Sequence, residues 1–161
     1  MEMHTPSNKL LIGRNEWCQI PDLNLPAIKA KIDTGAKTSS IHASNIKPIT
    51  KNNQAWVTFD VHPIQGNDDL SIACSAPVID TRYIMSSNGH KEYRYIISTS
   101  LKIADQHWKI QLSLSNRDPL KFRMLLGREA LNMHVLIDPS LHCHQGTFKK
   151  KDLYALYGIE L

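Results

Sequence analysis

The sequence predicts a mainly β protein that forms a single domain, residues 1–161. Its apolar segments are short, rich in Ile, Val and aromatic residues, and separated by turn residues, which is typical of strands. The chain of 161 residues has the length of one ordinary domain and shows no repeat or linker that would divide it. Hydrophobic residues at 42% and charged residues at 21% match a globular chain rather than a disordered one.

Six segments carry the strand pattern. They are LLIGR (10–14), AIKAKID (27–33), AWVTFDVHP (55–63), YRYIISTSLKI (93–103), HWKIQLSLS (107–115) and FRMLLG (122–127). Alternation is clearest from Trp108 to Leu114, where every second residue is apolar. This segment is therefore expected to be a half-buried strand with Ser113 on its polar face.

Turn signals connect these strands. Ser86-Ser87-Asn88-Gly89-His90 contains Asn-Gly, which tolerates positive φ at both residues and predicts a projecting hairpin. A second turn is expected at 104–107. The segment 45–77 has the least regular pattern, and loops or an insertion are expected there.

Helical segments are few and short. GREALNM (127–133) follows one predicted strand, and KDLYALYG (151–158) lies near the C-terminus, with Asp152 as a potential cap and Gly158 as a stop signal. One or two short helices therefore accompany the strands.

Charge and cysteine content exclude several classes of function. The net charge of +4 favours acidic partners only weakly, and KKKD (149–152) is too short to indicate a nucleic-acid site. No run of about eighteen apolar residues or signal-peptide core is present, so a cytoplasmic protein without a membrane partner is expected. Cys18, Cys74 and Cys143 are expected to be reduced fillers of the core, because none has an evident activating partner.

An acidic residue stands out in KIDTGAKTSS (31–40). A strand delivers Asp33 to a turn that Gly35 can make tight, where hydroxyl groups and backbone N–H donors can hold an ionised carboxylate. Asp-Thr-Gly by itself is also a common way to end a strand. A second signal comes from FRMLLGREAL (122–131), where an apolar strand ends at Gly127 and Arg128 opens a helix.

These two motifs, with the 86–90 hairpin between them, resemble the retroviral-type aspartic proteases, the retropepsins. With IGRNEW (12–17) and IDPS (137–140), they are similar to a bacterial retropepsin-like family once labelled ATP-dependent zinc proteases. Some members of that family are associated with ligases that add glutamates to a ribosomal protein.

The resemblance implies a closed six-stranded acid-protease barrel and no cofactor. It implies catalytic roles for Asp33, Thr34 and Gly35. The implied substrate contacts are Ala36, Ser86, Ser87, Asn88 and Gly89, and the implied structural neighbours of the site are Leu125, Leu126, Gly127 and Arg128. The expected activity is an aspartic endopeptidase that acts on a peptide or protein, with glutamate-rich peptides as one implied substrate.

One aspartate cannot supply both the base that activates water and the acid that protonates the carbonyl. The chain has a single Asp-Thr-Gly, because Asp80-Thr81-Arg82 lacks the glycine and Asp138-Pro139-Ser140 has a proline in the turn. A two-lobed enzyme would need roughly twice the length of one domain. The sequence therefore predicts a symmetric homodimer in which two copies of Asp33 meet.

Two alternatives remain open at the level of sequence. His142 and His144, at i and i+2, could begin a zinc site if the segment is extended, although no third ligand can be named. A surface or packing role for these histidines is the commoner outcome. The second alternative is a non-catalytic peptide-binding module on the same scaffold, since a fold does not guarantee a function.

Overall fold

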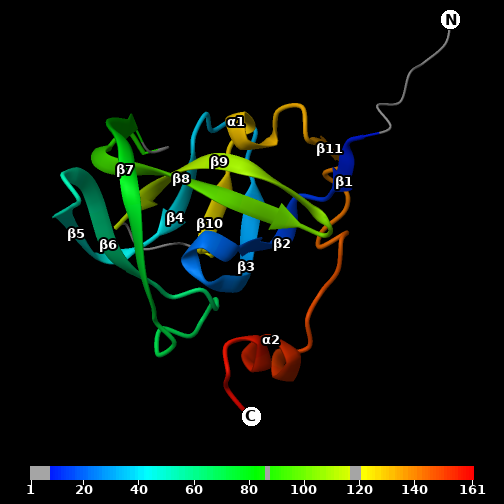
Figure 1. Ribbon diagram of the computed structural model, residues 1–161. Helices are drawn as coiled ribbons and strands as arrows, with labels where there is room; N and C mark the ends of the chain where they lie inside the picture. Colours follow the sequence, from blue (N-terminus) through cyan, green and yellow to red (C-terminus); the bar gives the residue numbers. More distant parts are fainter. Residues whose placement is uncertain (1–7, 86–87, 117–120) are drawn as a thin grey trace, which may run out of the picture.

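The computed structural model describes residues 8–85, 88–116 and 121–161 (Figure 1). The strands in chain order are β1 (Leu10–Ile12), β2 (Asn15–Ile20), β3 (Leu25–Ile32), β4 (Ser39–His42), β5 (Ser44–Lys51), β6 (Gln54–Val61), β7 (Ile72–Met85), β8 (Lys91–Ile103), β9 (Gln106–Ser115), β10 (Met124–Leu126) and β11 (Val135–Ile137). The helices are a 3-10 turn, η1 (Pro21–Leu23), and two α-helices, α1 (Arg128–Leu131) and α2 (Lys150–Leu156).

Six of the strands close into a barrel. Neighbouring strands pair in the order β2-β3-β10-β4-β9-β8, and Gln19 of β2 pairs with Lys102 of β8 to close the ring. Side chains such as Ile28, Ile41 and Leu112 fill the interior and are fully buried. The predicted mainly β class and closed six-stranded barrel are confirmed.

Three further strands extend the sheet beyond the barrel. β8 continues past β9 to pair with β7, which in turn pairs with β6, and β6 with β5. The prediction of loops across 45–77 was wrong, because in this range only 52–53 and 62–71 lie outside strands. Asn52 and Asn53, at φ of 53° and 62°, form the tight turn between β5 and β6. β5 is mostly exposed at the edge of the sheet, so its residues lack the apolar alternation of a half-buried strand.

The hairpin predicted around 86–90 joins β7 and β8. Met85 pairs with Lys91, and Gly89 has a φ of 83°, while Ser86 and Ser87 lie outside the described residues. Beyond the barrel the two strands pair with each other from Asp80 to Met85 and from Lys91 to Ile96. We call this segment, 80–96, the projecting hairpin. The predicted turn at 104–107 is also present, with Ala104 at a φ of 54°.

β9 differs from its prediction at one end. Its alternating pattern holds as far as Leu112, but from there to Ser115 both faces are buried, and Ser113 is 0% exposed. The projecting hairpin covers the face that was expected to be polar and open, because Arg94 lies against Ser113. Cover by a distant segment leaves no trace in local periodicity.

The two short helices occupy opposite ends of the barrel (Figure 1). α1 follows β10 directly, whereas α2 packs through Leu153 against Ala27 and Ile64. The hydroxyl of Tyr157 donates to the carbonyl of Ala27 and accepts from its N–H. The predicted cap was wrong, because Lys149 takes the N-cap position and Asp152 lies in the first turn.

Candidate active site

The strand order places the Asp33 turn beside the end of β10. β10 lies between β3 and β4, parallel to β3 and antiparallel to β4, so the loop that joins β3 to β4 passes over the end of β10. The N–H of Asp33 donates to the carbonyl of Leu126 at 2.9 Å, and the N–H of Ile32 donates to the carbonyl of Arg14 at 2.9 Å. Two remote segments, β10 and the turn at Arg14, thus fix the position of Asp33.

The turn itself is tight and open to solvent. The N–H of Gly35 donates to Oδ1 of Asp33 at 3.0 Å, and the N–H of Ala36 donates to the carbonyl of Asp33 at 3.2 Å. Asp33 is half-buried, while Thr34 and Gly35 are exposed. The hydroxyl groups expected to hold this carboxylate belong to Thr34, Thr38, Ser39 and Ser40. Within the described ranges none of them donates to it, so this part of the prediction was wrong, whereas the backbone N–H of Gly35 does donate.

Gly127 and Arg128 brace the turn from the side of β10. A Cβ on Gly127 would lie 2.8 Å from the carbonyl oxygen of Ala36, so only glycine allows this approach. The N–H of Gly127 donates to Oγ of Ser39 at 3.0 Å, and the N–H of Arg128 donates to the carbonyl of Ala36 at 2.8 Å. The guanidinium of Arg128 also donates to the carbonyl of Gly35 at 3.1 Å.

A groove of about 430 Å³ lies between this turn and the projecting hairpin. Residues 35–38 form one wall, residues 82–85 form the other, and Arg128 lies between them. Ala36 therefore lines the groove, as predicted from the resemblance. Asn88 and Gly89 are exposed nearer the end of the projecting hairpin and are not among the lining residues, so their predicted substrate contacts stay predictions.

The groove carries three cationic side chains, Lys37, Arg82 and Arg128. Arg82 donates to Asp80 at 2.6 Å and to Oε1 of Gln111 at 3.0 Å, and the bond from Arg82 holds the pKa of Asp80 below its usual range. Lys37 lies 3.8 Å from Glu129. Arg82 and Lys37 are two of the 19 Lys and Arg residues of the chain, and neither stands out in the sequence because a basic residue on the surface carries no local signal.

A second carboxylate, which the sequence did not single out, is buried on another side of the barrel. Glu16 is 0% exposed, and its oxygens accept backbone N–H groups from Gly13 at 2.8 Å, His144 at 2.9 Å and Gln145 at 2.9 Å. We call these contacts the Glu16 nest. They tie the loop after β11 to the turn between β1 and β2, where Arg14 supports Ile32.

The predicted zinc candidates belong to this loop. Cys143 has a φ of 47°, so the segment is a turn rather than an extended strand, and its thiol donates to Oδ1 of Asn15 at 3.1 Å. His142 and His144 are exposed. Within the ranges that the structure describes, no group of three or more His, Cys, Asp or Glu residues could hold a metal ion.

The three cysteines are buried and free, as predicted. Burial, together with the charge of Glu16, raises the pKa of the Cys18 thiol far above its ordinary value. Burial and the nearby charge of Asp60 raise the pKa of Cys74 to about 12. Both thiols are therefore protonated at neutral pH and unsuited to nucleophilic attack.

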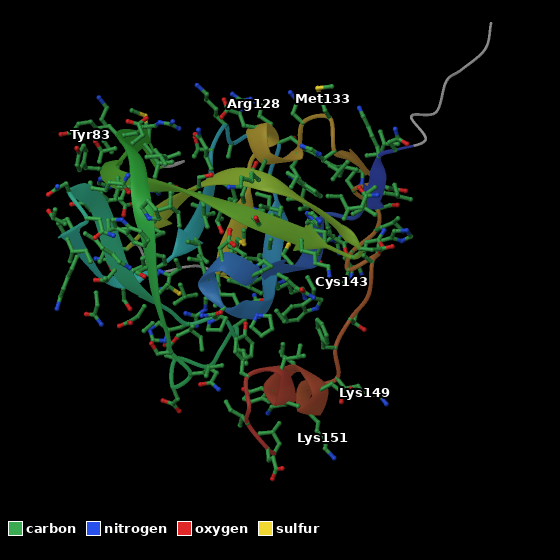
Figure 2. The ribbon with its side chains drawn as sticks, viewed as in Figure 1. Tyr83, Arg128, Met133, Cys143, Lys149 and Lys151 are labelled. Carbon is green, nitrogen blue, oxygen red and sulfur yellow. The ribbon has the colours of Figure 1, made fainter. Side chains whose placement is uncertain are left out.

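The lysine cluster near the C-terminus is remote from the groove. Lys149 and Lys151 lie at the α2 end of the barrel, whereas Arg128 lies at the opposite end (Figure 2). The positive charge of the groove therefore comes from its own walls. None of the helices in the described ranges is long and apolar enough to cross a membrane.

Comparison with known proteins places these features in context. The model of the RimB-like family, described as retropepsin-like aspartic endopeptidase RimB, matches residues 11–147. A crystal structure of a Legionella pneumophila protein of unknown function superposes with a TM-score of 0.71 at 26% identity, covering 85% of this chain and 98% of that one.

The curated relatives are longer proteins. One from Desulfotalea psychrophila, named probable alpha-L-glutamate ligase, is 48% identical over 152 residues, which cover 94% of this chain and 33% of that protein. A relative of the same name from Shewanella pealeana is 44% identical over 153 residues, which cover 95% of this chain and 33% of that protein. The chain thus matches only a third of these relatives.

Proposed function

This chain belongs to the RimB-like family of retropepsin-like aspartic endopeptidases, and we propose that it hydrolyses peptide bonds with Asp33 as its catalytic carboxylate. The observation that carries the proposal is the Asp33 turn beside the groove. Its carboxylate accepts one backbone N–H and is half-buried, and the residues that follow it in the turn, Gly35 and Ala36, line the groove of about 430 Å³. A carboxylate with free acceptor positions can bind and activate a water molecule.

The chemistry requires a second carboxylate, which we propose is Asp33 of a second copy. One aspartate of the dyad takes a proton from water as the oxygen attacks the carbonyl carbon, while the other gives its proton to the carbonyl oxygen. The tetrahedral intermediate then breaks its C–N bond: the protonated aspartate gives its proton to the leaving nitrogen, while a hydroxyl of the intermediate returns a proton to the other aspartate. Two carboxylates at such a short distance share one proton and titrate as a coupled pair.

The exposure of the Asp33 turn supports a dimer that forms through the end of the barrel where this turn lies. Thr34 and Gly35 are exposed, and Met133, which is 77% exposed, lies near the same end of the barrel as Arg128 (Figure 2). A two-fold axis beside the Asp33 turn would bring the grooves of the two protomers together.

We propose acidic peptides, including oligoglutamate, as the substrate class. Lys37, Arg82 and Arg128 give the groove three cations, of which Arg82 and Lys37 are paired with single acids on the same surface. The relatives named glutamate ligases carry this domain as a third of their length. A domain that cuts glutamate-rich chains would suit such a neighbour.

A second function has one observation in its favour. The relatives' names describe a ligase, and a domain attached to a ligase could bind its glutamate-rich product without cutting it. The same groove would bind the peptide, and Asp33 would have no catalytic role.

One experiment tests the proposal. Wild-type protein and Asp33→Asn are incubated with defined peptides, including oligoglutamate and a matched oligoglutamine, and the products are analysed by mass spectrometry. We expect cleavage by the wild type only, since acid–base catalysis contributes about 10²- to 10⁴-fold. Sedimentation at several concentrations should show a dimer for both proteins.

Other results would point elsewhere. Cleavage that survives in Asp33→Asn, or that a chelator abolishes, would contradict the aspartic mechanism. Peptide binding without cleavage by either protein would favour the binding module. Equal cleavage of oligoglutamate and oligoglutamine would contradict the acidic substrate class.

A further inference from the structure

The buried face of β9 contains a polar contact that the proposed reaction does not use. Arg94, on the projecting hairpin, has a side chain only 10% exposed, and its Nε donates to Oε2 of Glu92 at 2.9 Å. Its Nη1 donates to the hydroxyl of Ser113 on β9 at 3.2 Å. A cation is costly to bury unless it is paired and hydrogen-bonded, and Arg94 is both.

The contact continues from β9 into β4. Ser113 is 0% exposed, and its hydroxyl donates to the carbonyl of Ser39 at 2.9 Å. Because a guanidinium can only donate and a carbonyl can only accept, the Ser113 hydroxyl has one orientation that satisfies both partners. The bonds therefore run in a single direction, from Arg94 through Ser113 to Ser39.

Ser39 connects this series to the proposed site. Its own hydroxyl accepts the N–H of Gly127 at 3.0 Å, and Gly127 packs against the backbone of residues 36–38. Those residues form one wall of the groove, while the projecting hairpin that carries Arg94 forms the other. One buried guanidinium thus links both walls through described hydrogen bonds.

We propose that Arg94 is a positioning residue that fixes the distance between the two walls of the groove. The inference rests on the proposed function. Arg94 acts through Ser113 and Ser39, keeping Gly127 and the 36–38 wall in register with the projecting hairpin. A peptide held between these walls then presents its scissile bond to Asp33 in one position, and displacements of about 1 Å can cost about 10²-fold in rate.

A second buried arginine provides the contrast. Arg123 is 8% exposed and donates to Asp68 at 2.6 Å. Asp68 lies in the loop 62–71, and neither residue lines the groove. Loss of Arg123 should therefore cost stability without a specific effect on catalysis.

The decisive variant is Ser113→Ala, which breaks the series and leaves the pair of Arg94 with Glu92 in place. Its matched control is Ser115→Ala. The Ser115 hydroxyl donates to Glu92, the partner of Arg94, at 3.1 Å, and this bond does not lead toward Ser39. Arg94→Met keeps the apolar stem and removes every donor. Arg94→Lys keeps the charge but lacks the fork that serves two acceptors.

Two measurements are made on each variant: kcat and KM on the peptide that the wild type cleaves, and hydrogen exchange at the N–H of Gly127 by NMR. We expect Ser113→Ala and Arg94→Met to lower kcat about 10- to 100-fold with KM changed less. Exchange at Gly127 should accelerate in both, and Arg94→Lys should lie between them and the wild type. Ser115→Ala and Arg123→Met should leave both kcat and the exchange rate of the Gly127 N–H unchanged.

The inference is overturned if Ser113→Ala leaves both kcat and Gly127 exchange at wild-type values, or if Ser115→Ala lowers kcat as strongly. If Arg94→Met fails to fold, Ser113→Ala decides alone. If the wild type cleaves no peptide, the proposed function fails and the exchange data still decide: acceleration at Gly127 in Ser113→Ala but not in Ser115→Ala supports the positioning role, and its absence contradicts it.

Discussion

Asp33 and Glu16 are both carboxylates that accept backbone N–H groups near the ends of strands, yet their surroundings differ completely. Asp33 is half-buried and accepts a single N–H from Gly35. Glu16 is fully buried and accepts three N–H groups, one from the neighbouring Gly13 and two from His144 and Gln145 in the remote loop after β11.

The difference separates a reactive acid from a structural one. A carboxylate has about four acceptor positions, and the Glu16 nest fills most of them, which leaves none open to water at a fully buried site. Asp33 keeps most of its positions open beside a groove. An acid that must exchange protons with water therefore needs fewer protein donors than one that only holds loops together.

Glu16→Ala is the largest expected change in stability. It would leave three N–H groups without their acceptor, one buried at Gly13 and two partly buried at His144 and Gln145. A buried group left unpaired costs about 1–3 kcal/mol and a partly buried one less, so the loss is a large part of the stability of a typical domain. Urea unfolding followed by circular dichroism should show a strongly lowered midpoint or an unfolded chain. A midpoint within error of the wild type would show that the nest contributes little.

Two glycines test the surroundings of the two acids. A Cβ on Gly13 would lie 2.5 Å from the carbonyl oxygen of Leu141, and one on Gly127 would lie 2.8 Å from that of Ala36. We expect Gly13→Ala and Gly127→Ala each to lower the free energy of unfolding by about 1–3 kcal/mol. Measured on the folded fraction, only Gly127→Ala should also lower kcat. Equal activity in both variants would contradict a special role for the Gly127 contact.

Tyr157 extends the comparison to a buried neutral group. Burial raises its pKa to about 12 despite the opposing hydrogen bond to Ala27. The folded pKa lies above the unfolded value of about 10, so the stability linked to the protonated phenol is present below pH 10 and is lost as pH rises toward 12. Unfolding free energies at pH 9 and pH 11.5 should show this loss in the wild type and a smaller one in Tyr157→Phe.

Asp33→Asn is expected to change stability least, by about 0.5 kcal/mol or less, because the side chain is half open and makes one bond to the protein. The same variant should have the largest effect on cleavage. A large loss of stability would mean that Asp33 holds the fold in the way that Glu16 does. Thermal unfolding of the two variants side by side distinguishes these outcomes.

Local features of the chain were predictable wherever short-range rules decide the structure. Alternation of apolar residues identified β9, and the apolar run that ends at Gly127 identified β10. The Asn88-Gly89 pair marked the projecting hairpin. Asp33 could be singled out because its motif lies within four consecutive residues, and the motif at 122–131 supported it. β6 corresponds to the predicted strand at 55–63, whereas β5 was missed because it lies at the exposed edge of the sheet and lacks apolar alternation.

The sequence by itself determined six of the strands, several turns and the position of the candidate acid, because these depend on periodicity and on the backbone preferences of neighbouring residues. Only the tertiary structure decided that Glu16 is the carboxylate held in a nest, that Ser113 is buried beneath Arg94, and that Lys37 and Arg82 line the same groove. These contacts join residues far apart in the chain, so their chemistry depends on packing that no local pattern records.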